Sequence, residues 1–315
     1  MSIAFTFPGQ GSQAVGMGNE LKESFATARE TFEEIDEALG QNLSKIMADG
    51  PGETLTLTEN AQPALMAVSM AAVRVLENDF DYKVSDHAKF VAGHSLGEYS
   101  ALCAAGAFSV ADTARLLKTR GQAMQAAVPV GKGAMAALLG LELEAATALA
   151  EKTADGDVCQ VANDNAPGQV VISGSKAAVE RAVEQASDFG ARRAVLLDVS
   201  APFHCALMEP AVEIMRDALA SVDVQAPRVP VVANVLASAI QTPDEVVDSL
   251  LAQVTGTVRW RECVAYMAGQ GIEQVLEVGS GKVLSGLARR IERSLGAVNI
   301  GTPQDIDAYF EKLNS

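Results

Sequence analysis

Hydrophobic and polar residues alternate along the first 128 residues in a way that predicts strands followed by helices. Residues 3–7 and 90–93 are short apolar runs, which are typical of buried strands. Apolar residues recur at helical spacing over 20–39, 62–77 and 97–105. A further helix is expected from Ser109, a suitable N-cap, to about residue 127.

The middle of the chain has a different pattern. Strands are predicted at 134–139, 158–162, 169–173 and 193–198, and helices at 143–152 and 175–188. The order βαββαβ is that of a ferredoxin-like unit. We therefore expect a small subdomain, residues 129–199, inserted into a larger α/β domain formed by 1–128 and 200–315.

After this insert the α/β alternation resumes. The predicted elements are a helix after His204, a strand at 229–233, helices at 243–253 and 260–268, a strand at 273–278 and a helix at 282–294. Alternation of this kind predicts a mostly parallel sheet with helices on both faces.

Charge and composition narrow the function classes. The chain has 24 Lys and Arg against 40 Asp and Glu, so it has no general attraction for nucleic acid or an anionic membrane. The apolar run over 61–76 contains polar residues and is too short to cross a bilayer. The start of the chain lacks the features of a signal peptide, and the four cysteines have no metal-ligand spacing. We expect a cytoplasmic protein with reduced thiols.

The run Gly93-His94-Ser95-Leu96-Gly97 stands between a predicted strand and a predicted helix. Gly-x-Ser-x-Gly in this position forms a sharp turn that exposes the serine oxygen. The N–H groups at the start of the following helix can stabilise an oxyanion. Ser95 is therefore a candidate acyl-accepting nucleophile. The alternative is a glycine-rich turn whose serine caps a helix.

A serine nucleophile needs a base, and the chain has three histidines. His87 lies in a polar loop, and His94 adjoins Ser95, where it can support the turn but is badly placed as a base. His204 follows the last strand of the insert, and loops after strands carry the chemistry of many α/β folds. Asp198 is only six positions before His204, so a backbone carbonyl is an alternative group to orient the imidazole.

Several ordered motifs now show a resemblance. They resemble motifs of the malonyl-CoA:acyl carrier protein transacylases. The matching segments are Phe7-Pro8-Gly9-Gln10-Gly11-Ser12-Gln13, the Ser95 turn with Glu98-Tyr99, Lys118-Thr119-Arg120-Gly121, Ala201-Pro202-Phe203-His204 and Glu277-Val278-Gly279-Ser280-Gly281-Lys282. The shorter matches Val161-Ala162-Asn163 and Val258-Arg259-Trp260 agree with it. These enzymes load acyl groups in bacterial fatty acid synthesis and are related to acyltransferase domains of polyketide synthases. The resemblance implies a hydrolase-like α/β fold with a ferredoxin-like insert.

The resemblance also implies roles for single residues. Ser95 would be the nucleophile and His204 the base. The backbone N–H groups of Gln10 and Leu96 would form the oxyanion hole. Arg120 would bind the free carboxylate of the malonyl group.

Further roles concern the surroundings of the reacting groups. Gln253 would orient His204 through its main-chain carbonyl. Phe203, Asn163 and His94 would line the substrate pocket. In related polyketide acyltransferases a phenylalanine at the position of Phe203 accompanies malonyl, and a serine accompanies methylmalonyl.

The implied reaction is a ping-pong transfer from malonyl-CoA, through malonyl-Ser95, to the phosphopantetheine thiol of acyl carrier protein. It needs no metal or redox cofactor, and the resemblance favours a monomer. Because acyl carrier proteins are acidic, docking requires local positive charge. Candidate sets are Arg192 with Arg193, Arg259 with Arg261, and Lys282 with Arg289, Arg290 and Arg293.

Two other readings remain open. A serine thioesterase or hydrolase would use the same pair of Ser95 and His204, although Arg120 favours an anionic acyl group. A scaffold that binds carrier proteins without catalysis would not require Ser95, His204 and Arg120 together. The loading reaction is the same in fatty acid and polyketide synthesis, so the sequence leaves the pathway open.

Overall fold

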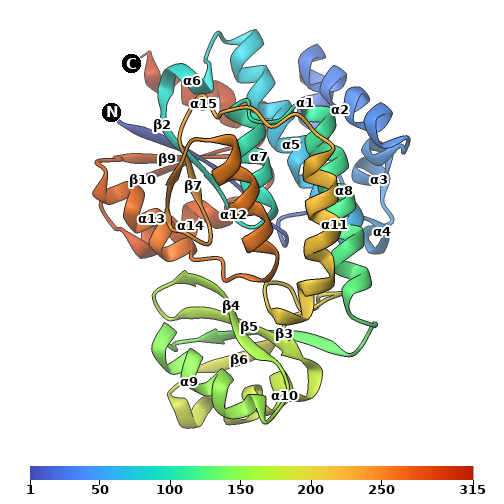
Figure 1. Cartoon of the computed structure of the whole chain (residues 1–315). Coiled ribbons are helices and arrows are strands. Elements are labelled where there is room, and N and C mark those ends of the chain that lie inside the picture. The colour runs from blue at the N-terminus through green and yellow to red at the C-terminus, as the bar shows by residue number, and fades with distance from the viewer. Residues whose placement is uncertain (315) are drawn as a thin grey trace.

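The computed structural model describes residues 1–314 and contains two β-sheets (Figure 1). The strands of the larger sheet are β1 (Ile3–Phe7), β2 (Ala88–Gly93), β7 (Val231–Ala233), β8 (Ser238–Ile240), β9 (Gln274–Val278) and β10 (Gly296–Ile300). They lie in the order β10-β9-β1-β2-β7-β8. All neighbours pair in parallel except β8, which is antiparallel to β7. The predicted mostly parallel sheet is confirmed.

Strand β1 lies in the interior of this sheet, and all five of its residues are buried. Phe5 and Phe7 point into one hydrophobic core, whereas Ala4 points into a second core on the opposite face. Since a parallel sheet is covered on both sides, its central strands are apolar at every position rather than at alternate ones. This explains why a continuous apolar run forms a strand here.

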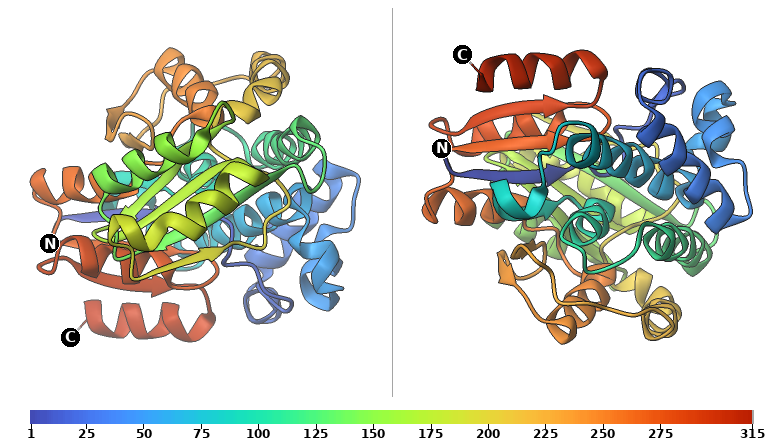
Figure 2. Two further views of the ribbon diagram at one scale, coloured as in Figure 1. Left: turned by 90° about the horizontal axis from the view of Figure 1, so that it is seen from below. Right: turned by 90° about the horizontal axis from the view of Figure 1, so that it is seen from above.

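Helices cover both faces of the larger sheet, as Figure 2 shows. Those before the insert are α1 (Asn19–Ser24), α2 (Ala26–Leu39), α3 (Leu43–Asp49), α4 (Gly52–Thr56), α5 (Thr58–Asp79), α6 (Val84–His87), α7 (Leu96–Ala104) and α8 (Val110–Ala127). Those after it are α11 (Glu209–Ala220), α12 (Pro243–Thr255), α13 (Trp260–Gly269), α14 (Val283–Ile291) and α15 (Pro303–Leu313), with a short 3₁₀ turn η2 (Ala206–Met208) before α11. Apolar residues of α13 and α14 form one core with Ala4, and α5, α7 and α8 pack in the other.

The smaller sheet contains β3 (Gly133–Leu139), β4 (Cys159–Ala166), β5 (Gln169–Ser175) and β6 (Arg193–Leu196) in the antiparallel order β4-β5-β3-β6. Helices α9 (Leu143–Ala154) and α10 (Lys176–Gln185), with the 3₁₀ turn η1 (Ala186–Phe189), complete the unit. This is the strand order of a ferredoxin-like fold. Figure 1 shows the helices on the side of the sheet that faces away from the larger unit.

Residues of β3 alternate between the two faces of the small sheet. Ala136 and Leu138 pack with α9 and α10 in a separate core. Met135 points the other way and joins the core of the larger unit. A backbone seam also links the units, because Asp164 N–H donates to Val258 O and Val258 N–H donates to Ala162 O, both at 2.9 Å. The insert is therefore fixed to the body at its sheet.

Three expectations about elements need correction. The single helix expected over 20–39 is divided into α1 and α2, because Phe25 adopts an extended conformation (φ −126°, ψ 127°). The loop expected around His87 contains the short helix α6, where the exposed imidazole stacks on Tyr82 at 3.7 Å between ring centroids. Strands β8 and β10 and helices α3, α4 and α15 were not predicted. Both strands are short and lie at the edges of the sheet, where the apolar pattern is weakest.

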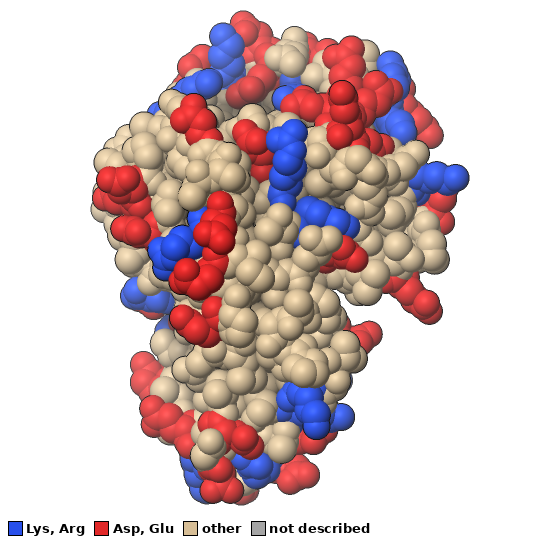
Figure 3. Space-filling model, turned by 45° about the vertical axis from the view of Figure 1, so that its right-hand side comes forward, with Lys and Arg blue, Asp and Glu red and all other residues tan. Residues whose placement is uncertain are grey.

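Charged side chains are unevenly spread over the surface. On the face shown in Figure 3, acidic and basic groups lie at the upper and lower ends and along the left side, and the central surface between the two units is largely uncharged. Among residues 1–314, no helix is long and apolar enough to cross a membrane.

Candidate functional site

Ser95 occupies a strained turn between β2 and α7. Its backbone lies at φ 53° and ψ −112°, a conformation that residues other than glycine rarely adopt. The turn is tight: a Cβ on Gly93 would lie 1.8 Å from the carbonyl oxygen of Gly97, and one on Gly97 would lie 2.3 Å from that of Phe7. Both glycines are therefore required sterically, and the expected serine elbow is present.

The structure brings His204 to Ser95. The Ser95 Oγ lies 2.8 Å from His204 Nε2, and His204 Nδ1 lies 2.9 Å from the main-chain oxygen of Gln253. Because a carbonyl oxygen only accepts hydrogen bonds, Nδ1 carries the proton and Nε2 is left as the acceptor for the serine hydroxyl. Burial, with the nearby charge of Arg120, lowers the pKa of His204 to about 3. The imidazole is thus neutral at physiological pH.

Arg120 lies beside this pair on α8 with its side chain 1% exposed. Its Nη1 donates to Gln62 Oε1 at 2.8 Å, and its Nη2 donates to Ser95 Oγ at 3.2 Å and to Gln253 Oε1 at 2.9 Å. Its Nε has no hydrogen-bond partner in the described part of the chain. Burial lowers the pKa of the guanidinium, although an arginine remains protonated in proteins.

No acidic side chain of residues 1–314 forms an ion pair with Arg120. A buried cation without a direct counter-ion is costly, because burial removes its hydration. The positive charge of Arg120 is therefore unpaired among the described residues of the site, which suits the binding of a small anion close to the serine oxygen.

Side chains behind the elbow hold its backbone. Asn234 Oδ1 accepts the Ser95 N–H at 2.7 Å, and Asn234 Nδ2 donates to Gly93 O at 2.7 Å. Gln253 Nε2 donates to Ser95 O at 3.1 Å and to Glu98 Oε2 at 3.0 Å. These bonds anchor a turn whose local conformation is unfavourable.

Sequence reasoning gave no role to Asn234, Glu98 or Gln62. A signal existed for Glu98, the only charged residue of α7, whose other members are uncharged. The acid is fully buried, and its hydrogen-bond partners are the Asn234 backbone and the side chains of Ser249 and Gln253 rather than the candidate catalytic histidine. Gln62 had no comparable signal, because a glutamine on a long helix is usually solvated.

A cavity of about 330 Å³ opens beside Ser95, between the larger unit and the small sheet. The cavity is lined by the candidate residues Ser95, His204, Arg120, Gln10, His94, Asn163 and Phe203. Gln62, Met124 and Met135 are among its other lining residues. The residues expected around a substrate therefore meet at one cavity. Leu96 and Gln253 lie behind its wall.

The surrounding residues differ in how they are held. His94 Nε2 lies 2.8 Å from Asn165 Oδ1, so this ring is held away from the serine oxygen. Asn163 is buried in β4, where it pairs with Val258. As the first residue of α7, Leu96 has a backbone N–H without a partner inside the helix. Gln10 lies on the loop after β1.

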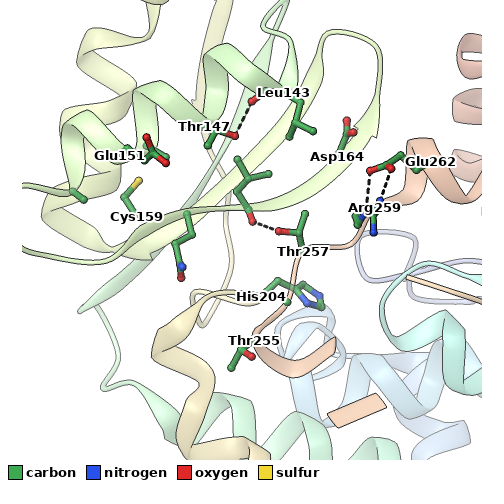
Figure 4. A pocket seen from close by; sticks show the side chains of 15 residues that line it. Leu143, Thr147, Glu151, Cys159, Asp164, His204, Thr255, Thr257, Arg259 and Glu262 are labelled. Carbon is green, nitrogen blue, oxygen red and sulfur yellow. Dashed lines mark hydrogen bonds and ion pairs between the residues drawn. The ribbon is translucent and has the colours of Figure 1, made fainter. Parts of the chain in front are cut away.

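A second, larger cavity of about 790 Å³ reaches His204 from another side. Figure 4 shows Leu143, Thr147 and Cys159 of the insert opposite Thr255, Thr257 and Arg259 of the larger unit. Arg259 is paired with Glu262 there, and Arg261 forms ion pairs with Asp164 at 2.8 Å and Glu142 at 3.7 Å. These two arginines already have acidic partners within the chain.

Among the described residues, the side chains that could bind a metal ion do not form a ligand set. The part of the chain that the structure describes contains no group of three His, Cys, Asp or Glu side chains able to hold a metal ion. The four cysteines are free and buried.

Comparisons with known proteins agree with this geometry. The acyl transferase domain family matches residues 4–294, so the chain belongs to the acyl transferases. The malonyl CoA-acyl carrier protein transacylase of Bacillus subtilis (strain 168) is 44% identical over 312 residues, which span 99% of this chain and 97% of the relative. That of Escherichia coli (strain K12) is 45% identical, with 98% and 99% covered. The chain thus belongs to the malonyl-CoA:acyl carrier protein transacylases.

Solved structures give the same answer. The acyl-carrier-protein-S-malonyltransferase of Bartonella henselae is 56% identical, superposes with a TM-score of 0.97, and both chains are covered completely. A malonyl-transacylase solved in complex with a type II PKS acyl-carrier protein is 40% identical, with a TM-score of 0.95 and coverage of 99% and 100%. The protein is a transferase of this fold.

Proposed function

We propose that this enzyme moves the malonyl group from malonyl-CoA to the phosphopantetheine thiol of acyl carrier protein by a ping-pong mechanism, in support of fatty acid synthesis. One observation carries the proposal: a buried arginine without a carboxylate partner lies 3.2 Å from a serine oxygen that is hydrogen-bonded to a neutral histidine. The arginine suits the free carboxylate of malonate, and the Ser–His pair suits acyl transfer.

In the first half-reaction, His204 Nε2 accepts the proton of Ser95 as the Oγ attacks the thioester carbonyl. The tetrahedral intermediate places negative charge on the former carbonyl oxygen, which the backbone N–H groups of Gln10 and Leu96 are suited to bind. Collapse breaks the C–S bond, and the proton on His204 passes to the departing CoA thiolate. The products are malonyl-Ser95 and CoA.

In the second half-reaction, the pantetheine thiol gives its proton to His204 and its sulfur attacks the ester carbonyl. Collapse breaks the bond between the carbonyl carbon and Ser95 Oγ, and the proton returns to the serine. The main-chain oxygen of Gln253 keeps the imidazole in the required tautomer through both halves, as an aspartate does in other serine enzymes.

Selectivity follows from the walls of the cavity. The free N–H groups of Arg120 are suited to a planar carboxylate. Phe203 lines the same cavity, where its ring would crowd a methyl branch on the acyl chain. Asn163 and His94 supply polar surface beside them. We propose that the segment 129–199 acts as the subdomain that closes this cavity over the body formed by 1–128 and 200–315.

The acyl carrier protein must find positive charge on an enzyme whose formal net charge is −16. Figure 3 shows basic groups dispersed among acidic ones on the face drawn. Arg259 and Arg261 form ion pairs within the chain, which makes them weaker candidates for docking the carrier protein. The residues of α14 remain candidates: Arg290 is exposed and donates to Gln169 Oε1 at 2.7 Å, at the tip of the small sheet.

Mass spectrometry after mixing the enzyme with malonyl-CoA tests the proposal. We expect a malonyl adduct on Ser95, absent in Ser95→Ala, that disappears when acyl carrier protein bearing its phosphopantetheine arm is added. The malonyl group should then be found on the carrier. Rapid release of free malonate without a carrier would instead indicate a thioesterase, and no adduct at all would indicate a scaffold.

A further inference from the structure

The side-chain amide of Gln253 lies between two buried charges. Its Oε1 accepts from Arg120 Nη2 at 2.9 Å, and its Nε2 donates to Glu98 Oε2 at 3.0 Å. A guanidinium can only donate and a carboxylate can only accept, so the orientation of the amide is fixed at both ends. All three side chains are at most 1% exposed. The arrangement is a bridge from cation to amide to anion.

The carboxylate end of this bridge is fully enclosed. Besides Gln253, the backbone N–H of Asn234 donates to Glu98 at 2.8 Å and the Ser249 hydroxyl donates at 3.2 Å. Burial raises the pKa of Glu98 to about 7, even though these donors and the charge of Arg120 favour the ionised form and oppose that rise. The surroundings of the carboxyl group consist of donors, which is the pattern that a carboxylate needs.

Glu98 does not contact the arginine directly. An acid in direct contact would offset the buried charge of Arg120, but it would also occupy the planar fork that a substrate carboxylate requires. An acid far away would leave the charge uncompensated at a large desolvation cost. One interposed amide gives partial compensation and leaves N–H groups of the fork free.

We propose that Glu98 is a positioning residue for acyl selection: it sets the Gln253 amide, and through it the orientation of Arg120, while leaving the fork open to the substrate carboxylate. This inference rests on the proposed role of Arg120. It assigns Glu98 no contact with substrate and no part in proton transfer.

The variant Glu98→Gln tests the inference, because glutamine keeps the shape and removes the charge. An amide at 98 can donate as well as accept, so Gln253 is no longer forced to present Oε1 to Arg120. We expect the ratio of kcat/KM for malonyl-CoA to that for acetyl-CoA to fall about tenfold, as for one hydrogen bond to a charged group. The KM for malonyl-CoA should rise, and that for acetyl-CoA should change little.

Ser249→Ala is the matched control. It removes another hydrogen bond to Glu98 and leaves the Gln253 bridge intact, so the ratio should stay at the wild-type value. A merely structural role for Glu98 would lower the melting temperature of Glu98→Gln without moving the ratio, and that result would overturn the inference.

A double exchange, Glu98→Gln with Gln253→Glu, keeps the test decisive if the single variant does not fold. It retains one carboxylate and one amide in contact but moves the charge next to Arg120, where it takes up the fork. The ratio should fall again, and a wild-type ratio would refute the inference. Arg120→Ala distinguishes failure of the proposed role of Glu98 from failure of the proposed role of Arg120. If Arg120→Ala loses malonyl preference while the Glu98 variants keep theirs, only the role of Glu98 is wrong.

Discussion

Replacing Arg120 by alanine is the most direct test of how the enzyme recognises its acyl group. A guanidinium carries five N–H groups, and three hydrogen bonds from Arg120 are present in the structure. Among the remaining N–H groups, the buried Nε has no hydrogen-bond partner in the described residues. The substitution removes these donors and leaves a substrate carboxylate without its buried partner.

The magnitude follows from the charge-assisted hydrogen bonds that are lost. Counted as one charge-assisted hydrogen bond, the loss is about 1.5–3 kcal/mol, which corresponds to roughly 10- to 150-fold in rate at 1.4 kcal/mol per tenfold. Acetyl-CoA has no terminal carboxylate, so it loses none of this stabilisation. We expect the malonyl-to-acetyl ratio of kcat/KM to fall by about 10- to 150-fold in Arg120→Ala.

The assay is the rate of Ser95 acylation by each thioester, followed by intact-protein mass spectrometry. Arg115→Ala is a matched control on the same helix, because this exposed arginine pairs with Asp112 at 2.8 Å. It should leave the ratio unchanged. An unaltered ratio in folded Arg120→Ala would refute the carboxylate clamp, since no other role of the arginine distinguishes the two substrates.

Three further predictions concern the base, the elbow and the partner. With the pKa of His204 at about 3, the base is already deprotonated from pH 5 upward, so kcat/KM for acetyl-CoA, which we expect not to depend on Glu98, should show no protonation step near 6.5. Gly97→Ala should destabilise the protein by about 3 kcal/mol or more in denaturant unfolding, because its Cβ would lie 2.3 Å from Phe7 O. Arg290→Glu should raise the KM for acyl carrier protein and leave that for malonyl-CoA unchanged.

Each of these has a result that contradicts it. An acidic limb of kcat/KM for acetyl-CoA centred near 6.5 would mean that the imidazole is not held neutral in the free enzyme. Gly286→Ala serves as control for the elbow, since nothing lies within 4 Å of its added Cβ, and equal stability of the two alanine variants would exclude the steric explanation. An unchanged carrier KM would remove Arg290 from the interface.

Local patterns were sufficient to predict much of this fold. A continuous apolar run predicted β1, and the helix N-cap at Ser109 is present, with its side chain accepting from Asp112 N–H. The order of elements in the insert was also predicted, because each of its strands and helices has its own short-range periodicity. The break at Phe25 was missed, since one residue in an extended conformation does not interrupt the helical spacing of apolar positions.

The interior of the site was less accessible to sequence reasoning. Ser95 and His204 were found through a turn motif and elimination among few histidines. The polar groups behind them are recognisable only in three dimensions, because Glu98 meets the backbone of Asn234 from 136 positions away and the side chain of Gln253 from 155. Buried polar residues of this kind carry no periodic signal, and each is explained only by its distant partners.

The proposed nucleophile and base share an unusual backbone, with Ser95 at φ 53° and His204 at φ 58°. Such conformations cost about 1–3 kcal/mol each and persist only where the surroundings impose them. For Ser95 those surroundings come from Asn234 and Gln253, which are 139 and 158 positions later in the chain. A chain still emerging from the ribosome therefore has its serine long before it has the residues that hold the serine turn, and we expect it to become able to accept an acyl group only when α12 has been made and has docked.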